Sequence, residues 1–573
     1  MKAARTYPDP PAIPLGDEAG EYAGALDLML TDAALGTHRR FLPGASTARF
    51  VGALARRPRR VASRVNGLAV EYARIAAGSS SIAPSTRDRR FADPAWTQNP
   101  LLRRSVQAYL ATTTLVEGLV QDVPLEWQDR ERISFLASNL LQAVSPSNNP
   151  LISPVAWKAM IDSGGVSAVR GLRNLLGDLA RAPRVPTMVP PDAYEVGSDL
   201  ALTHGSVVLR TPMFELIQYQ PQTETVYSTP LVIVPPTINK FYIMDIAPQR
   251  SLIEYFVSQG VQVFLMSWRN PDARHSKWGL DTYARAVLKA LDTTRTITET
   301  DSAHLLGACS GGILSALVAA HLADGGRQDQ LASLTLMVTL LDQTRAGTTG
   351  ALADDNAAKA AIAASRARGY LDGKQLAELF AWLRPSDLVW NYWVNNYLQG
   401  RTPPAFDILY WNADTTRMPS KLHRDFLSLA MANALTRPGG ATLLGTEIDL
   451  GQVQLDSYVV AGSADHICPW RNCYASTQLL GGKSRFILST NGHIASLVNP
   501  PGNKKSSYQV AEDTPASADD WAAAASTTAG SWWPDYIRWL GERSGEMVPA
   551  PESPGGRQFQ VLGDAPGSYV LDH

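Results

Sequence analysis

The chain has 573 residues, of which 45% are hydrophobic and 18% charged, and its net charge is −1. This composition excludes a fibrous or disordered chain, and the small net charge gives no general attraction to nucleic acid. Three cysteines in a chain of this length favour a reducing compartment over a disulfide framework. No apolar run reaches about 18 residues and the start resembles no secretory signal, so we expect a cytoplasmic protein without a transmembrane segment.

Residues 1–85 are rich in Ala, Arg and Pro, and we expect a basic tail with helical patches there. Between Asp32 and Glu71 the segment has eight arginines and no acidic residue. Such a run either faces an anionic surface or the phosphate of a ligand, or is a solvated basic tail.

Residues 86–200 show apolar side chains at helical spacing, for example Leu102, Val106 and Tyr109, and are expected to form a helical N-terminal domain. From residue 201 the pattern changes. Stretches 207–209 and 214–219 are typical of two antiparallel strands. Further strands are expected at 231–234, 261–268, 304–306, 334–341, 457–461 and 485–488, with helices such as 283–293 and 312–322 between them.

Alternating strands and helices predict a mostly parallel sheet covered on both faces. We therefore expect an α/β catalytic domain over 201–545. The interval of about 342–449 has little strand character and is rich in Ala and Trp, so it is expected to be a helical cap insertion. Residues 546–573 are expected to form a C-terminal tail.

The hexapeptide Gly307-Ala308-Cys309-Ser310-Gly311-Gly312 lies where the strand at 304–306 meets the helix at 312–322. A nucleophile between glycines at a sharp strand-to-helix turn is typical of the nucleophile elbow of α/β-hydrolases. The sequence therefore predicts an α/β-hydrolase fold with Cys309 as its nucleophile.

A base and an orienting acid should follow in the chain order nucleophile, Asp, His. Asp465 follows the strand at 457–461 and His493 follows the strand at 485–488, so both lie beyond the carboxyl ends of strands. We predict a catalytic triad of Cys309, His493 and Asp465, with His493 as general base and Asp465 holding its tautomer. His466, Cys468 and Cys473 are interpreted as structural or packing residues.

The oxyanion hole is expected to use the backbone N–H of Ser310 and one from the loop after the strand at 231–234. Pro235 and Pro236 have no N–H to donate, so Thr237 or Ile238 is the expected donor. A cysteine nucleophile favours acyl transfer from a thioester, because exchange between thioesters is nearly isoenergetic. We expect no metal site and no bound cofactor, and the sequence does not identify cofactor-binding residues.

Several stretches beside the elbow resemble the polyhydroxyalkanoate synthases, the polyester polymerases of bacterial storage granules. The stretches that carry this resemblance are 91–96, 234–242, 267–271, 390–397, 406–412 and 492–494. The likeness runs from about residue 88 to the C-terminus, is of the single-subunit type, and at 406–417 looks closer to the medium-chain-length class.

The resemblance implies that (R)-3-hydroxyacyl-CoA is polymerised into a polyester, with release of CoA and a growing chain held as a thioester on Cys309. It also implies a homodimer at the granule surface, whereas the absence of a nucleic-acid partner is expected from the small net charge. Two alternatives stay open: a thioesterase or polyester depolymerase with the same triad, and a non-catalytic granule-coating protein. The preferred monomer length, the CoA-binding residues, the dimer interface and the cap motion are not specified by the sequence.

Overall fold

The computed structural model describes residues 26–36, 44–86, 88–344, 350–465 and 467–573. In this part of the chain the main sheet has eleven strands in the order β15-β14-β13-β12-β7-β6-β4-β5-β2-β1-β17. The six central strands, from β13 to β5, are parallel, and antiparallel strands extend the sheet at both sides. This arrangement confirms the predicted α/β fold.

The parallel strands are β4 (Leu231–Val234), β5 (Val263–Trp268), β6 (Ala303–Ala308), β7 (Leu331–Met337), β12 (Ser457–Gly462) and β13 (Ser484–Ser489). The antiparallel ones are β1 (Gly205–Arg210), β2 (Phe214–Tyr219), β14 (Ser507–Val510), β15 (Ser526–Ala529) and β17 (Gly563–Asp564). Three small pairs are separate from this sheet: β3 (Thr225–Tyr227) with β16 (Met547–Pro549), β8 (Tyr370–Leu371) with β9 (Met418–Pro419), and β10 (Thr442–Leu443) with β11 (Thr446–Glu447).

The predicted strands are confirmed in position, including the antiparallel pair β1 and β2. Some boundaries were wrong, and the strand expected over 261–268 begins at Val263. The strand expected over 334–341 ends at Met337, because Val338 has a φ of 44° and cannot continue an extended backbone. The edge strands β14, β15 and β17 were missed, since short polar strands carry little apolar pattern.

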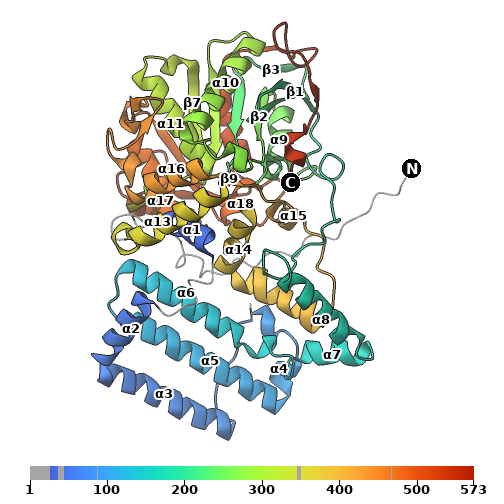
Figure 1. The fold of residues 1–573 in the computed structure, drawn as a ribbon, viewed down its shortest axis with the longest axis vertical. Helices are drawn as coiled ribbons and strands as arrows, with labels where there is room; N and C mark the ends of the chain where they lie inside the picture. Colours follow the sequence, from blue (N-terminus) through green and yellow to red (C-terminus); the bar gives the residue numbers. More distant parts are fainter. Residues whose placement is uncertain (1–25, 37–43, 87, 345–349, 466) are drawn as a thin grey trace.

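Helices cover both faces of the sheet (Figure 1). Helix α11 (Ser310–Asp324) is apolar on nearly all sides and is buried against β6 and β7, as expected for a central helix. The others on this part are α9 (Leu252–Ser258), α10 (Leu280–Thr298), α17 (Trp470–Leu479), α18 (His493–Leu497), α19 (Ala518–Ala524) and α20 (Trp533–Gly541).

The segment between β7 and β12, expected as a cap, is mainly helical. It contains α13 (Gly350–Arg368), α14 (Gly373–Leu383), π-helical turns at Ser386–Trp390 and Trp393–Leu398, α15 (Asp407–Ala413) and α16 (Ser420–Met431). Trp382, Trp390, Trp393 and Tyr397 contact one another edge to face. These aromatic contacts hold the π-helical turns together.

A separate helical layer lies below the sheet-containing part (Figure 1). Its members are α2 (Ala45–Ala55), α3 (Pro58–Ala77), α4 (Ala95–Gln98), α5 (Pro100–Gln121), α6 (Trp127–Ala143), α7 (Pro154–Asp162) and α8 (Val166–Leu179). Helix α1 (Leu26–Leu35) instead packs on α13, α14 and α16 of the cap segment. The helical character predicted for residues 86–200 is confirmed.

A basic tail was the expectation for residues 1–85. In the described part of this segment, α2 and α3 pack on α6 and α5, and arginines bind acidic side chains there. Arg49 pairs with Asp129, and Arg64 contacts Asp122 at 2.9 Å. Part of the arginine run is therefore neutralised within the chain. Arg39 and Arg40 lie outside the described residues, and the domain boundaries themselves stay a prediction.

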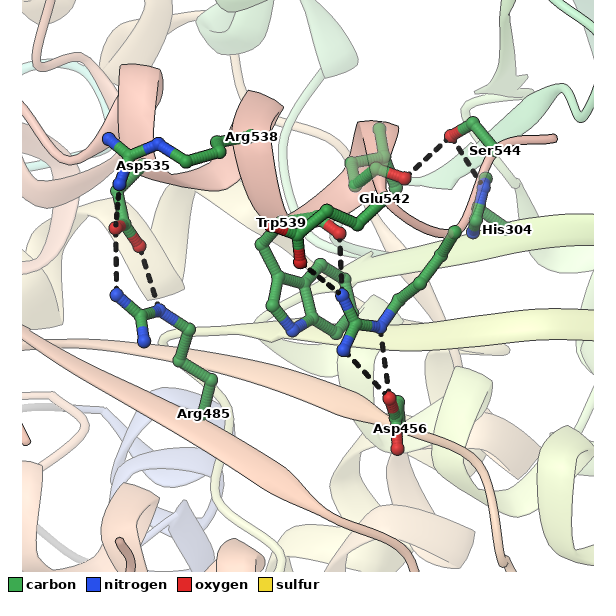
Figure 2. A network of polar contacts seen from close by, with 10 residues as sticks. His304, Asp456, Arg485, Asp535, Arg538, Trp539, Glu542 and Ser544 are labelled. Carbon is green, nitrogen blue, oxygen red and sulfur yellow. Dashed lines mark hydrogen bonds and ion pairs between the residues drawn. The ribbon is translucent and has the colours of Figure 1, made fainter. Parts of the chain in front are cut away.

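A polar network ties the amino ends of the central strands to α20 and the residues after it (Figure 2). His304, at the start of β6, contacts the hydroxyl of Ser333 at 2.7 Å and that of Ser544 at 3.0 Å. Arg485 on β13 donates two hydrogen bonds to Asp535, at 2.9 and 2.8 Å. Burial lowers the pKa of His304 to about 3, so its ring is neutral.

Candidate active site

Cys309 occupies the turn between β6 and α11, as the sequence predicts. Its φ of 52° and ψ of −121° are unusual for a residue with a side chain, and Ser310 begins the helix directly after it. The glycines that follow are needed for close packing. A Cβ on Gly311 would overlap the Val234 carbonyl oxygen, and one on Gly312 would overlap the Thr339 hydroxyl. The small residues therefore let α11 approach β4 and β7.

Asp465 and His493 lie beyond the carboxyl ends of β12 and β13, beside the turn that carries Cys309. The Nδ1 atom of His493 lies 2.7 Å from Oδ2 of Asp465. The other carboxylate oxygen accepts hydrogen bonds from the backbone N–H groups of Ile467 and Cys468, each at 2.8 Å. The loop after β12 thus fixes the carboxylate that holds the imidazole.

The structure brings Cys309 and His493 together, and it adds Cys468. The two Sγ atoms and a ring nitrogen of His493 all lie within 4.8 Å of one another. Cys468 is buried, as is Cys473, whose thiol faces the Cys468 carbonyl oxygen at 3.6 Å. Cys473 is a buried packing residue, as predicted. The position of Cys468 beside the nucleophile was not predicted from the sequence. His466 lies outside the described residues.

One signal could have indicated Cys468. It follows Asp465 by three residues, and a carboxylate fixed by a tight loop accepts N–H groups two or three residues later. That geometry directs the start of the next segment toward the site. The amino-acid type alone did not show it, because buried cysteines are usually packing residues.

The surroundings of Cys309 favour its ionised form. A hydrogen bond with the Cys468 thiol lowers the pKa of Cys309, burial opposes this, and His493 and the Ser310 N–H lower it further. The result is a pKa well below the usual thiol range. Burial alone would lower the pKa of His493, but the Asp465 carboxylate and Cys309 raise it well above the usual range. The site therefore favours a thiolate beside an imidazolium.

Of the expected oxyanion donors, Ser310 directly follows Cys309. The Ser310 N–H is directed at the Cys309 sulfur. The Thr237 N–H donates to the Ser310 hydroxyl at 2.9 Å, and the two hydroxyls lie 3.0 Å apart. Within the described part of the chain, Ile238 donates no backbone hydrogen bond. Of these two N–H groups, that of Ile238 is therefore free to bind an oxyanion. The Thr237 N–H is free only if the Ser310 hydroxyl turns away from it.

Two further features surround the site. Cys309, Cys468 and His493 offer soft donor atoms that a thiophilic ion such as zinc could bind, although an ion there would occupy the nucleophile. A small apolar pocket lies one helical turn from Cys309, lined by Ile313, Leu340, Leu341, Gln343, Phe426 and Leu435. The expectation that catalysis needs no metal or bound cofactor stays a prediction.

Known proteins resemble this chain over most of its length. Residues 87–256 match the family described as "Poly-beta-hydroxybutyrate polymerase (PhaC) N-terminus", and residues 230–500 match "alpha/beta hydrolase fold". The chain is 45% identical to poly(3-hydroxyalkanoate) polymerase 2 of Ectopseudomonas oleovorans over 516 residues, which cover 90% of this chain and 92% of that protein. The chain belongs to the poly(3-hydroxyalkanoate) polymerase family.

Two other relatives show similar coverage. The identity is 43% with poly(3-hydroxyalkanoate) polymerase 1 of Ectopseudomonas oleovorans, over 90% of this chain and 92% of that one. It is 39% with the poly(3-hydroxyalkanoate) polymerase subunit PhaC of Cupriavidus necator, over 87% of this chain and 85% of that protein. The family resemblance stated from the sequence motifs is confirmed, and so is the α/β-hydrolase fold.

Proposed function

We propose that this protein polymerises (R)-3-hydroxyacyl-CoA into a polyester and releases CoA, with the growing chain held as a thioester on Cys309. The observation that carries the proposal is a thiol at a strained elbow within 4.8 Å of an imidazole that is fixed by a buried carboxylate. Membership of the polymerase family supplies the substrate class.

The first half-reaction transfers an acyl group from one sulfur to another. The Cys309 thiolate attacks the thioester carbonyl of the substrate, and the tetrahedral oxyanion is stabilised by the N–H groups of Ser310 and of Ile238 or Thr237. The carbon–sulfur bond to CoA breaks, and the departing thiolate takes the proton held by His493. The products are acyl-Cys309 and free CoA.

In the second half-reaction a 3-hydroxyl group attacks an acyl-cysteine. His493 accepts the hydroxyl proton, an ester bond forms, and the bond from the carbonyl carbon to the Cys309 sulfur breaks. Asp465 keeps Nδ1 of His493 protonated, so that Nε2 faces the reacting groups. A thioester suits this step, because its exchange for an ester is favourable.

The replacement of Cys309 by Ala tests the assignment. CoA release from 3-hydroxyacyl-CoA should fall to the uncatalysed rate, because the turn between β6 and α11 then lacks the thiolate that attacks the thioester. The matched control is Cys473→Ala, a buried thiol that faces a carbonyl oxygen, which should release CoA at a rate close to that of the unmodified protein. Undiminished release by the Cys309 variant would overturn the proposal.

Hydrolysis by the same triad is the second enzymatic candidate. Water in place of the 3-hydroxyl would give free hydroxy acid, as in a thioesterase or depolymerase. Assay of the product separates the two, because the polymerase gives insoluble polyester and the hydrolase gives soluble acid. A non-catalytic granule-coating protein is the remaining alternative, and it predicts that Cys309 resists alkylation.

We also propose that the helical layer contacts the polyester granule. One stripe of α8 is apolar and 50–71% exposed, and it consists of Val166, Val169, Leu172, Leu176 and Leu179. The opposite face carries Gly171, which lies against the Tyr397 carbonyl oxygen, and Ser167, which lies against Gly400. The helix therefore packs on the chain with small residues, and its large apolar residues are left for another apolar surface.

Leu172→Glu with Leu176→Glu tests this contact. Binding to polyester particles should weaken by about tenfold or more, because two charges would have to be removed from water. CoA release from soluble substrate gives the control. Equal sedimentation of both proteins with the particles would contradict the proposal.

The remaining proposals rest on the family resemblance and on composition. The resemblance suggests a homodimer, a location at granules, no cofactor besides the CoA that the substrate brings, and a preference for medium-chain monomers. The small net charge favours no nucleic-acid partner, and the few cysteines favour the cytoplasm. In the described residues, no helix is both long and apolar enough to cross a bilayer. Light scattering of the purified protein tests the dimer, and competition between short and medium substrates tests the preference.

A further inference from the structure

Cys468 lies in the catalytic centre without a part in the proposed reaction. Its thiol is buried beside Cys309, and both sulfur atoms lie within 4.8 Å of a ring nitrogen of His493. Its backbone N–H is fixed at 2.8 Å from the Asp465 carboxylate, so the loop that holds the triad acid also sets the position of this thiol. The loop after β12 therefore holds the backbone of Cys468 beside the triad.

The placement differs from that of an ordinary packing cysteine. Cys473, the third cysteine of the chain, is also buried, and its thiol contacts the main-chain carbonyl oxygen and the thiol of Cys468. On its other side, Cys468 faces the partly exposed thiol of Cys309, whose surroundings favour a thiolate. A reactive thiolate next to a second thiol is the arrangement from which disulfides form after oxidation.

We propose that Cys468 is a resolving thiol that captures oxidised Cys309 in a reversible intramolecular disulfide. The modification site is the pair Cys309 and Cys468, and the co-reactant is a peroxide. Two features of the structure carry this: the short separation of the two sulfur atoms, and the partial exposure of Cys309, which gives a small oxidant access to it.

The chemistry balances in two steps. The Cys309 thiolate attacks hydrogen peroxide, the O–O bond breaks, and the products are the sulfenic acid of Cys309 and hydroxide. The Cys468 sulfur then attacks the sulfenic sulfur, and its proton leaves with the hydroxyl group as water. The two thiols together have given up two electrons, one from each sulfur, and the peroxide oxygens end as hydroxide and water. A dithiol such as dithiothreitol reverses the bond by exchange.

The disulfide would protect the nucleophile as well as switch it off. Without a nearby thiol, sulfenic acid is oxidised further to sulfinic acid, which dithiothreitol does not reduce. With Cys468 in place, the first oxidation product is captured before the second peroxide reacts. The predicted loss of activity rests on the proposed role of Cys309, whereas the disulfide itself does not.

The experiment oxidises the full-length, reduced protein with hydrogen peroxide, blocks free thiols by alkylation, and maps peptides by mass spectrometry. The expected product is a pair of peptides joined through Cys309 and Cys468, whose mass is two hydrogens less than the sum of the two free peptides. Cys473 should be alkylated only after the protein is unfolded. Sulfinic acid on Cys309 without that joined pair would overturn the proposal. This readout stands even if the protein proves not to be a polymerase.

The second arm compares recovery after dithiothreitol in the unmodified protein, Cys468→Ser and the matched control Cys473→Ser, each relative to its own untreated activity. The unmodified protein and the control should recover at least about fivefold more of their CoA release than Cys468→Ser, in which Cys309 reaches the sulfinic state. Equal recovery in all three would overturn the proposal. Should Cys468→Ser not fold, Cys468→Ala gives the same comparison.

Substrate separates this inference from the proposed function. During turnover with 3-hydroxyacyl-CoA, acylation of Cys309 should lower the yield of the joined peptides. A disulfide that forms equally with and without substrate would contradict the acyl-cysteine, while leaving the modification site intact.

Discussion

Two buried histidines lie at opposite edges of the parallel part of the sheet, and their hydrogen-bond partners differ. His493 follows the carboxyl end of β13 and contacts a carboxylate and a thiol, and its pKa is raised. His304 lies near the amino end of β6 between two serine hydroxyls, and its pKa is lowered to about 3. Burial opposes the charged form in both cases. The charged partners at one edge therefore decide which ring can hold a proton.

The catalytic residues and the contacts that stabilise the fold therefore lie at different edges of the sheet. At the carboxyl edge, Cys309, Asp465 and His493 meet where loops follow the strands. At the amino edge the ion pair of Arg485 with Asp535 binds β13 to α20 (Figure 2). One edge of the sheet holds a proton carrier, and the other holds a neutral hydrogen-bonded ring. Substitutions at the two edges should therefore have different signatures.

The largest effect is expected for His493→Gln. Glutamine keeps a polar side chain but cannot exchange the proton, so CoA release should fall by roughly 10⁴-fold or more. A thermal unfolding scan is the control, and it should show a folded protein. A loss below about tenfold would show that another group acts as the base.

Asp465→Asn should reduce CoA release by roughly 10²–10⁴-fold. The amide oxygen can still accept both N–H groups of the loop, which bind one carboxylate oxygen, but the amide nitrogen that then faces His493 cannot stabilise the imidazolium or hold its tautomer. Asp535→Asn, which weakens the pair with Arg485 at the other edge, is the matched control. If both variants lost similar activity, the separation of chemistry from support would be wrong.

The next largest effect is expected in the pH dependence of the rate at which Cys309 is alkylated. A lowered thiol pKa means that the thiolate persists as the pH falls, until the pH passes below that lowered value. In the unmodified protein, alkylation by iodoacetamide should therefore be nearly constant from about pH 6 to 9.

In His493→Gln the thiol loses the neighbouring cation, and its pKa should rise. Alkylation at neutral pH should then be slower by about tenfold and should increase toward alkaline pH. Identical profiles in the two proteins would contradict the thiolate–imidazolium pair.

The smallest effect concerns stability in acid. His304 is neutral in the folded protein, whereas an exposed histidine in the unfolded chain binds a proton below its usual pKa of about 6.5. The free energy of unfolding therefore falls by up to about 1.4 kcal/mol per pH unit because of this group, as the pH falls below that value. His304→Gln should reduce the fall in melting temperature between neutral pH and about pH 5. An equally steep fall in both proteins would contradict a neutral His304.

The elbow and the triad order were predictable from the sequence because small residues and chain order are local signals. Gly311 and Gly312 are required by close contacts that any such turn makes. Asp465 and His493 were found because each directly follows an apolar strand. The strand at 334–341 was placed correctly but ended too late, since nothing in the residue type of Val338 shows its left-handed φ.

Contacts between distant segments were harder to predict. The packing of α1 on the cap helices depends on the burial of Leu30 beside His423, whose ring contacts the Leu30 carbonyl oxygen at 3.2 Å. The approach of Cys468 to Cys309 depends on how the loop after β12 closes. Such contacts can be identified only in the folded structure, because the sequence of neither segment indicates which other segment it contacts.

The most direct test of the central claim traps the covalent intermediate. The protein is mixed with an acyl-CoA that lacks the 3-hydroxyl group, so that acylation occurs but the chain cannot grow, and the product is digested under acidic conditions. We expect one acylated peptide, with the modification on Cys309 and one CoA released for each acyl group bound. An acyl group found on another residue, or steady CoA release without any acylated Cys309, would contradict it.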